Sequence, residues 1–132
     1  MKYLLDTNIC ITIIRKRPAA LLQKLVSHQP GEVGISSITL AELFHGAAKS
    51  AQPDQNMAAL QQFLLPLILA EFDQQAAHAY GKIRAELERK GQVIGSMDML
   101  IAAHATSLGA ILITNNLREF RRVKGLALED WL

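Results

Sequence analysis

Cysteine is nearly absent from this chain of 132 residues, and the single Cys10 excludes an internal disulfide. Long apolar runs are missing too: the most apolar stretch, residues 63–70, is far shorter than the roughly 20 residues that cross a bilayer. Lys2 and Asp6 interrupt the first apolar stretch, so it lacks the pattern of a secretory leader. These absences predict a cytoplasmic protein that does not enter a membrane.

Several ligand classes lack their sequence signatures. The four histidines show no HExxH or similar spacing, and one cysteine cannot complete a zinc site. There is neither a GxGxxG nor a GxxxxGK[ST] motif, so a nucleotide cofactor has no support. Aromatic residues make up only 5%, which argues against a platform that stacks single-stranded bases.

Half of the residues are apolar, which is enough to fill the core of one domain of this length. No repeat, linker or low-complexity segment divides the chain, so we expect a single domain over residues 1–132. The continuous apolar run at 3–5 predicts a strand buried on both faces, and the runs at 33–35 and 110–113, with a weaker one at 126–128, predict further strands. Helical stretches separate them, and this alternation predicts a three-layer α/β/α fold with a central, mostly parallel sheet of four to five strands.

Three of the expected helices have predicted core faces. A helix beginning at Ser36-Ser37 is expected to bury Ile38, Ala41 and Ala48. A helix opened at Pro53 is expected to carry Leu60, Phe63, Leu64 and Leu67, with Pro66 kinking or ending it. A helix capped by Asp73 shows the spacing of one buried face, at Ala76, Tyr80, Ile83 and Leu87.

The candidate site is a set of four acidic residues, Asp6, Glu42, Asp98 and Glu119, that lie in apolar or turn contexts. Each has a simpler explanation: a helix cap for Asp6, a solvated surface for Glu42, the helix dipole for Asp98 and pairing with a nearby arginine for Glu119. Carboxylates in apolar runs are costly, however, unless they bind a cation or receive hydrogen bonds. Three or four of them at one sheet edge predict an all-oxygen site for Mg²⁺, or Mn²⁺, that supports phosphodiester hydrolysis.

The charge distribution fits a polyanionic substrate. Without those four residues, eight acidic residues remain against 14 basic ones, an excess of six. Arg118, Arg121 and Arg122 follow the polar strand end Thr114-Asn115-Asn116, so they are candidates for contact with RNA phosphates. An ordinary basic surface with solvated helix faces would look the same. With so few aromatic residues, recognition of a folded RNA by its shape fits better than base stacking.

Four segments, in this order, resemble the four motifs of PIN-domain nucleases: residues 4–8 (LLDTN), 37–43 (SITLAEL), 95–102 (GSMDMLIA) and 113–120 (ITNNLREF). The resemblance is closest to VapC toxins of the enterobacterial type and includes the ending LEDW at 128–131. It implies a PIN-like fold and a metal-dependent endoribonuclease. It also implies a VapB-type antitoxin partner, a homodimer, and initiator tRNA, cut in the anticodon region, as the substrate.

The resemblance also implies roles for individual residues. Asp6, Glu42 and Asp98 correspond to the metal-binding acids, Thr114 to a hydroxyl that hydrogen-bonds the first acid, and Asn8 to a nearby polar support. At Asn116 many PIN domains carry a fourth aspartate, and this departure puts a second metal ion in doubt. Glu119, one helical turn further on, is the residue that we expect to supply the missing catalytic carboxylate.

Two other classes of function compete with this interpretation. A phosphatase of the haloacid dehalogenase type also begins with a strand and an aspartate, but it needs a second aspartate where this chain has Asn8. A non-catalytic, receiver-like binding domain needs adjacent acids near its start and a lysine after a late strand, and neither is evident. Separately, residues 60–69 carry more apolar surface than one helix face buries, which predicts a two-fold partner or a fully buried helix.

Overall fold

The computed structural model describes all residues, 1–132, and its centre is a sheet of five parallel strands. The strand order is β3-β2-β1-β4-β5. β1 (Tyr3–Leu5) is central, β2 (Val33–Ser36) and β4 (Ile111–Ile113) flank it, and β3 (Ile68–Ala70) and β5 (Leu128–Glu129) form the edges. The expected parallel sheet is therefore confirmed, with all five strands parallel.

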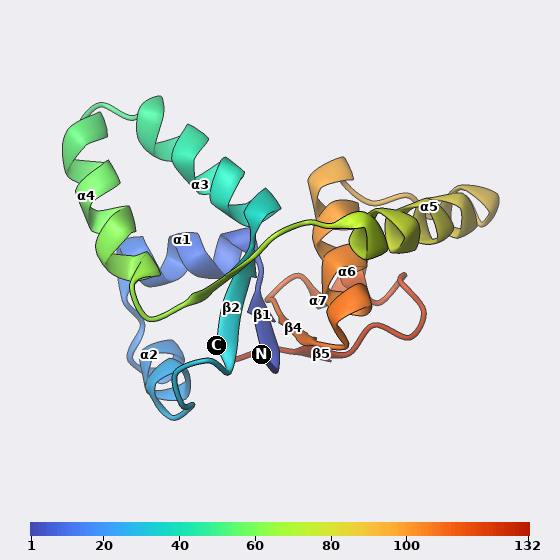
Figure 1. Ribbon diagram of the computed structural model, residues 1–132, viewed down its shortest axis with the longest axis horizontal. Coiled ribbons are helices and arrows are strands. Elements are labelled where there is room, and N and C mark those ends of the chain that lie inside the picture. Colours follow the sequence, from blue (N-terminus) through green and yellow to red (C-terminus); the bar gives the residue numbers. More distant parts are fainter.

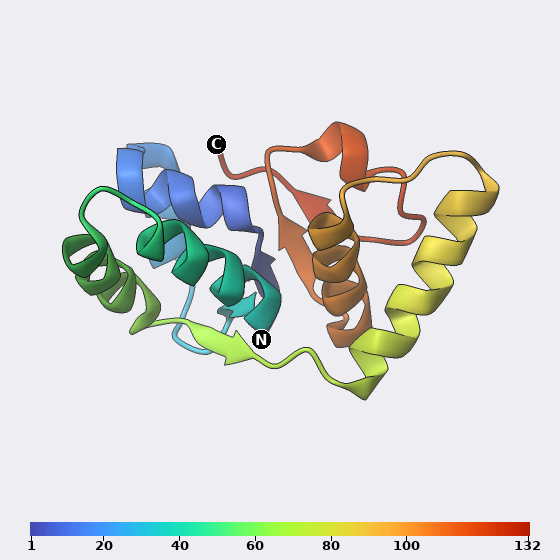
Figure 2. The same cartoon turned by 90° about the horizontal axis from the view of Figure 1, so that it is seen from above.

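Helices cover the sheet from two sides (Figures 1 and 2). One group consists of α1 (Thr7–Lys16), α2 (Ala19–Val26), α3 (Ser37–Ala48) and α4 (Pro53–Leu64). The other consists of α5 (Gln74–Arg89), α6 (Ser96–Leu108) and the short α7 (Leu117–Phe120). The three-layer α/β/α architecture is thus confirmed. No helix is long and apolar enough to cross a membrane.

The central strand explains why its sequence is continuously apolar. Tyr3 and Leu5 belong to the core on the side of α1 and α2, whereas Leu4 belongs to the core beneath α6. Successive side chains of a strand point to opposite faces, and here both faces are covered. All three residues of β1 are buried for this reason.

The edge strand β3 was not predicted, and the expectation of helix as far as Leu67 was wrong. α4 ends at Leu64, before Pro66 as expected, and the chain then pairs with β2. The pairing depends on Gly34, because a Cβ there would lie only 2.6 Å from the carbonyl oxygen of Ile68. A strand of only three residues is too short to show a clear sequence pattern, and the contact on which it depends involves a distant glycine. Because the segment is not one helix, the alternative of a fully buried helix is also wrong.

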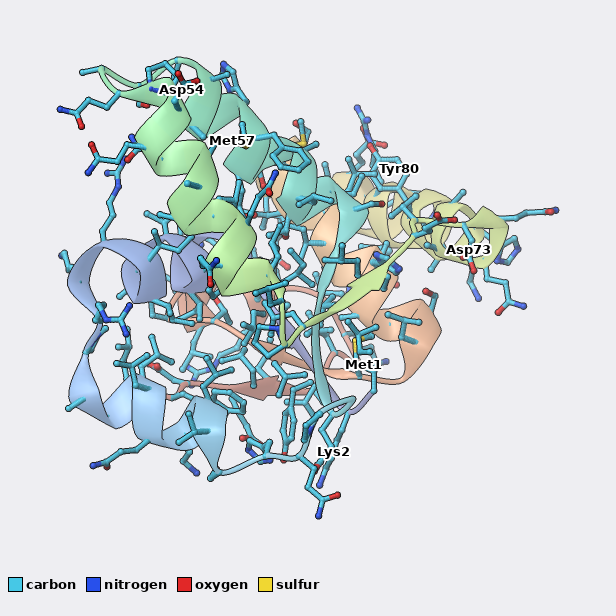
Figure 3. The ribbon with its side chains drawn as sticks, turned by 60° about the vertical axis from the view of Figure 1, so that its left-hand side comes forward. Met1, Lys2, Asp54, Met57, Asp73 and Tyr80 are labelled. Carbon is cyan, nitrogen blue, oxygen red and sulfur yellow. The ribbon has the colours of Figure 1, made fainter.

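The predicted core faces of α5 and α3 were confirmed to different extents. On α5 the expected face is confirmed: Ala76 and Leu87 are buried, and Tyr80 and Ile83 pack partly buried against the same core. Figure 3 shows α5, with Asp73 and Tyr80 labelled, on the side away from α4. On α3 the prediction was right only for Ile38, which packs partly buried against the same core; Ala41 and Ala48 are exposed, and the buried positions are Thr39, Leu43 and Ala47. Most of α3 is apolar, so periodicity could not select its inner face.

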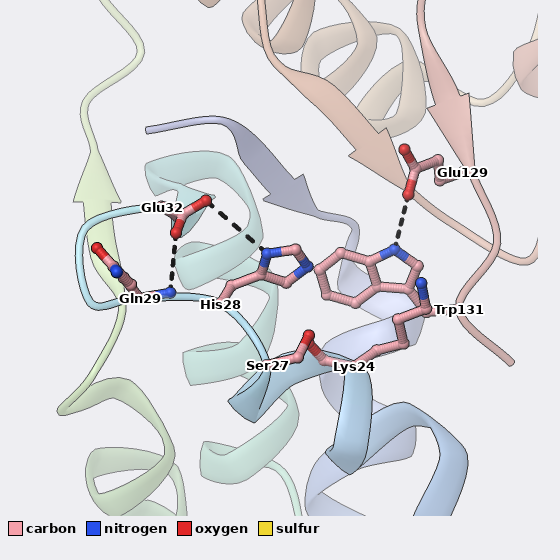
Figure 4. A network of polar contacts seen from close by, with 7 residues as sticks. All are labelled: Lys24, Ser27, His28, Gln29, Glu32, Glu129 and Trp131. Carbon is pink, nitrogen blue, oxygen red and sulfur yellow. Dashed lines mark hydrogen bonds and ion pairs between the residues drawn. The ribbon is translucent and has the colours of Figure 1, made fainter.

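The end of the chain closes a corner of the molecule next to α2. Trp131 is 4% exposed, and its ring centroid lies 5.1 Å from that of Tyr3 and 5.1 Å from that of His28. Its indole N–H donates to Glu129 over 3.0 Å, and His28 Nδ1 lies 3.8 Å from Glu32 (Figure 4). The C-terminal tail is thereby fixed against α2 and the start of β1.

Candidate active site

Two polar strand ends meet at the centre of the sheet, as predicted. Leu5 and Ile113 are register partners, so Asp6 and Thr114 follow neighbouring parallel strands at the same edge. The Asp6 N–H donates to the Ile113 carbonyl oxygen over 3.0 Å, which fixes the turn out of β1. The crevice at the carboxyl ends of such strands is where open α/β sheets place their ligands.

Asp6 is buried, with 3% of its surface exposed. It caps α1 by accepting the Ile9 N–H at 2.8 Å, so the simple role as a helix cap is real, but it uses only one carboxylate oxygen. Burial raises the pKa of Asp6 to about 6, and the charges of Asp98 and Glu42 add to the rise. Hydrogen bonds from the Thr114 hydroxyl and from the Ile9 N–H oppose it.

Asp98 lies in the first turn of α6 and is partly buried. Its pKa is raised above the usual value by burial, then by the negative charge of Glu119 and then by that of Glu42. Asp98 in turn raises the pKa of Asp6. Through these charge interactions the four acids, which come from distant parts of the sequence, form one electrostatic group, and their convergence on one cation stays a prediction.

Glu42, on α3, is not simply a solvated residue. It is partly buried, and the Thr7 hydroxyl donates to its Oε1 over 2.6 Å. The Thr7 oxygen also lies 3.1 Å from the hydroxyl oxygen of Thr39, which is completely buried. The start of α1 is thus connected to Glu42 through side chains as well as through packing.

Glu119 is bound to the residue at which the chain departs from the family pattern. The Asn116 side-chain amide donates to Glu119 Oε2 over 3.2 Å, and the Asn116 backbone N–H donates to Thr114 Oγ1 over 2.9 Å. The alternative that Glu119 pairs with an arginine is wrong, because none of the three ion pairs in the structure includes it. The nearby Arg122 donates instead to the Val93 carbonyl oxygen over 3.2 Å.

The remaining predicted residues lie around this group without joining its hydrogen bonds. Asn8 is exposed in the first turn of α1, and its side chain makes no hydrogen bond. Arg118 and Arg121 are exposed on and just after α7. The supporting role of Asn8 and the RNA contacts of the arginines stay predictions. Cys10 is a buried free thiol, as expected of a structural residue.

The donor chemistry of the group fits a hard divalent cation. All four acids offer oxygen, none has a basic partner, and the charge of each disfavours ionisation of a neighbour. As the side chains stand, no three of them lie close enough together to enclose an ion. Three of these acids could share one ion only after some side-chain adjustment.

Sequence reasoning missed two hydroxyl contacts near this edge. Thr39 lies three residues before Glu42, a spacing that puts both on one helix face, and this signal was available. No such signal points to the contact between His104 Nδ1 and Ser36 Oγ, at 2.7 Å, which joins residues 68 positions apart. Burial lowers the pKa of His104, so it fastens α6 to the start of α3 in its neutral form.

The sequence and the fold both match characterised proteins. The PIN domain model matches residues 3–126. The tRNA(fMet)-specific endonuclease VapC of Shigella flexneri is 47% identical over 131 residues, which cover 99% of this chain and 98% of the relative. The chain belongs to the VapC family of PIN-domain ribonucleases. Ribonuclease VapC2 of Haemophilus influenzae is 46% identical over 132 residues, which cover 100% of this chain and 99% of the relative.

Solved VapC structures have the same fold over their whole length. DNA-bound VapBC from Salmonella typhimurium matches with a TM-score of 0.97 and 45% identity, covering 100% of this chain and 99% of that chain. VapBC2 from Rickettsia felis, bound to a promoter DNA fragment, matches with a TM-score of 0.94 and 42% identity, covering 100% of both chains. The predicted resemblance is confirmed, so the protein is a VapC ribonuclease and neither a phosphatase nor a non-catalytic receiver-like domain.

Proposed function

We propose that this VapC ribonuclease is a toxin that cuts initiator tRNA in its anticodon region, with Mg²⁺ or Mn²⁺ held by Asp6 and Asp98. The observation that carries the proposal is the crowding of uncompensated carboxylates at the central sheet edge, where burial and like charges raise the pKa of both residues. The relatives named as tRNA(fMet)-specific endonucleases support the choice of substrate.

The chain's own residues divide the work at this edge. Asp6, fixed by the Ile9 N–H and the Thr114 hydroxyl, and Asp98, on the first turn of α6, hold the cation. Glu42 lies beside this cation site, near both aspartates, and together with Glu119 it completes the acidic catalytic set. A bound divalent cation activates water and neutralises the charge that develops on the phosphate.

Basic residues next to the acids are placed to bind the RNA backbone. Arg118, on α7, and Arg121, directly after it, are exposed and close to Glu119 in sequence. We assign phosphate contacts to them and to Arg122, which has a second role through its bond to Val93. Such contacts fix the position of the substrate without reading its bases, so selection of the tRNA rests on its shape.

A groove beside the acids supports control by a VapB-type antitoxin in the cytoplasm. It lies between α1, α3 and α4, is lined by Ile11, Ile14, Leu43 and Leu60, and reaches Glu42. An amphipathic antitoxin helix in this groove would bury its apolar face. A basic side chain from it would pair with Asp6 or Asp98 and displace the cation. Relatives crystallised as VapBC complexes support this kind of partner.

A second copy of the chain is the proposed cover for the end of α4 and for β3. Leu65, Ile68 and Leu69 are 76%, 42% and 49% exposed, and they lie together at the edge of the sheet. Two-fold association would bury them and shield the free strand edge. Light scattering at tens of micromolar tests this: a dimer is expected, and a monomer contradicts it.

The enzymatic proposal is tested with purified, antitoxin-free protein and two transcripts, initiator tRNA and elongator methionine tRNA. With Mg²⁺ we expect cuts in the anticodon region of the initiator only, mapped by sequencing of the ends. Chelation of the metal and the Asp6→Asn variant should each abolish them. Equal cleavage of both tRNAs contradicts the substrate, and cleavage that persists in the variant contradicts the site.

A further inference from the structure

Two threonine hydroxyls link Glu42 to the helix that begins at the first acid. Thr7 is the first residue of α1, directly after Asp6, and its Oγ1 lies 2.6 Å from Glu42 Oε1. Thr39, one turn before Glu42 on α3, places its Oγ1 3.1 Å from that of Thr7. Thr39 is completely buried, and no buried polar side-chain atom in the structure lacks a partner. The only partner of its hydroxyl is Thr7.

The chemistry of these groups fixes the direction of the chain of hydrogen bonds. Each hydroxyl has one hydrogen to donate, and an ionised carboxylate has none. Thr7 must therefore donate to Glu42, and Thr39 must donate to the lone pair of Thr7. In this order both hydroxyl dipoles point toward Glu42 Oε1, and each bond polarises the next. One oxygen of Glu42 is engaged, and the other stays free.

We infer that Thr7 and Thr39 are positioning residues that hold Glu42 in one rotamer, with Oε2 available to the cation site. The inference rests on the proposed role of Glu42 in that site. Ordering a glutamate side chain costs conformational entropy. Because the two hydroxyls order Glu42 when the protein folds, that entropy is not lost again when the metal binds. Loss of such outer-shell partners typically weakens metal binding about 10- to 100-fold.

Besides Glu42, the Thr7 hydroxyl contacts only the buried Thr39 hydroxyl, so any cost of leaving Thr39 without a partner appears in the melting measurement. The N-terminus of α1 is capped by Asp6, so the cap remains when the Thr7 hydroxyl is removed. Valine has nearly the same shape as threonine, so Thr7→Val removes the hydrogen bond and leaves the backbone unchanged. Thr12, on the same helix, makes no side-chain hydrogen bond. Thr12→Val is therefore the matched control.

The test measures Mn²⁺ binding by electron paramagnetic resonance on purified, antitoxin-free protein, next to thermal melting without metal. For Thr7→Val we expect Mn²⁺ affinity to fall by about tenfold, and for Thr39→Val by several-fold. Thr7→Ser, which keeps the hydroxyl, should bind nearly as the unchanged protein does, as should Thr12→Val. If Thr39→Val does not fold, Thr39→Ser replaces it, with near-normal binding expected.

A double-mutant cycle separates positioning from a general loss of structure. In a Glu42→Ala background, Thr7→Val should have no further effect on Mn²⁺ affinity, because its target is gone. Unchanged affinity in Thr7→Val, tighter binding, or an equal loss in the Glu42→Ala background would each overturn the inference. If Asp6→Asn still bound Mn²⁺ normally, the proposed site itself would fail, and this outcome is distinct from the others.

Discussion

The carboxyl edge of β1 and the corner around Trp131 handle charge in opposite ways. At the corner, Glu32 lies next to His28 and Glu129 accepts the indole N–H of Trp131, so each acid has a partner. At the edge, Asp6 and Asp98 face other acids and have no basic partner. The acids of the corner are paired within the protein, whereas Asp6 and Asp98 at the edge lie among like charges, which is where we propose that a cation binds. Burial and neighbouring charges raise the pKa of Asp6 and of Asp98, so their ionised forms destabilise the folded edge, and the corner has no such group.

The largest effect is expected from Asp6→Asn, which removes the most buried charge of the edge. Asparagine can still accept the Ile9 N–H and cap α1, so the fold should persist. Cleavage of initiator tRNA should fall by about 1,000-fold or more, since the amide is a poor ligand for the cation. Single-turnover kinetics at saturating Mg²⁺ measure the loss. Activity within tenfold of the unchanged protein would contradict the assignment.

The corner should respond in the reverse manner. Trp131→Ala removes a buried ring that stacks on His28 and contacts Tyr3, and it should lower the free energy of unfolding by about 3 kcal/mol. Cleavage per folded molecule should stay the same, because the corner holds none of the acids. Urea denaturation measures the first effect, and a rate measured well below the melting temperature measures the second. If Trp131→Ala cleaved RNA more slowly but kept its free energy of unfolding, the corner would serve cleavage rather than stability, and this would contradict the prediction.

The pH dependence of stability sharpens the comparison further. The pKa of Asp6 is about 6 in the folded protein and near 3.8 in an unfolded chain, so the folded state binds the proton more tightly. Without metal, the contribution of Asp6 to stability is therefore complete below pH 4 and is lost as the pH rises through about 6. Relative to Asp6→Asn, the unchanged protein should lose about 2–3 kcal/mol across this range.

Urea denaturation of both proteins at several pH values measures that loss, and groups common to the two cancel in the difference. Burial lowers the pKa of His104 and so favours unfolding at acid pH, but it does so equally in both proteins. Saturating Mg²⁺ at pH 7 should restore the stability of the unchanged protein and leave Asp6→Asn unaffected. If the difference in the free energy of unfolding between the two proteins did not change with pH, the folded state would not disfavour the ionised form of Asp6.

The smallest of these effects concerns Glu119. Of the neighbouring charges, that of Glu119 contributes most to the raised pKa of Asp98. The Glu119 carboxylate also accepts a hydrogen bond from the Asn116 side-chain amide. If Glu119 replaces the fourth aspartate of the family, Glu119→Gln should weaken metal affinity or rate by about tenfold, while Asn116→Asp should be tolerated. A Mg²⁺ titration of cleavage measures both variants. A normal titration for Glu119→Gln would make Glu119 a surface residue only.

Much of the architecture followed from local signals. Continuous apolar runs before Asp6 and Thr114 predicted buried parallel strands with polar ends, and the 4-3-4 spacing on α5 predicted its inner face. The same reasoning failed where local signals are absent. β3 is three residues long and depends on the bare backbone of Gly34, and α3 is apolar nearly all round.

The sequence alone determined which acids to suspect, because a carboxylate between apolar neighbours is costly wherever the chain folds. It also determined the family, since four motifs in order are independent of any contact between them. Only the tertiary structure decided what those acids touch. The Thr7 hydroxyl reaches Glu42 across 35 positions, and His104 reaches Ser36 across 68. Such contacts depend on how helices pack, and packing is set by the whole core rather than by the residues that meet.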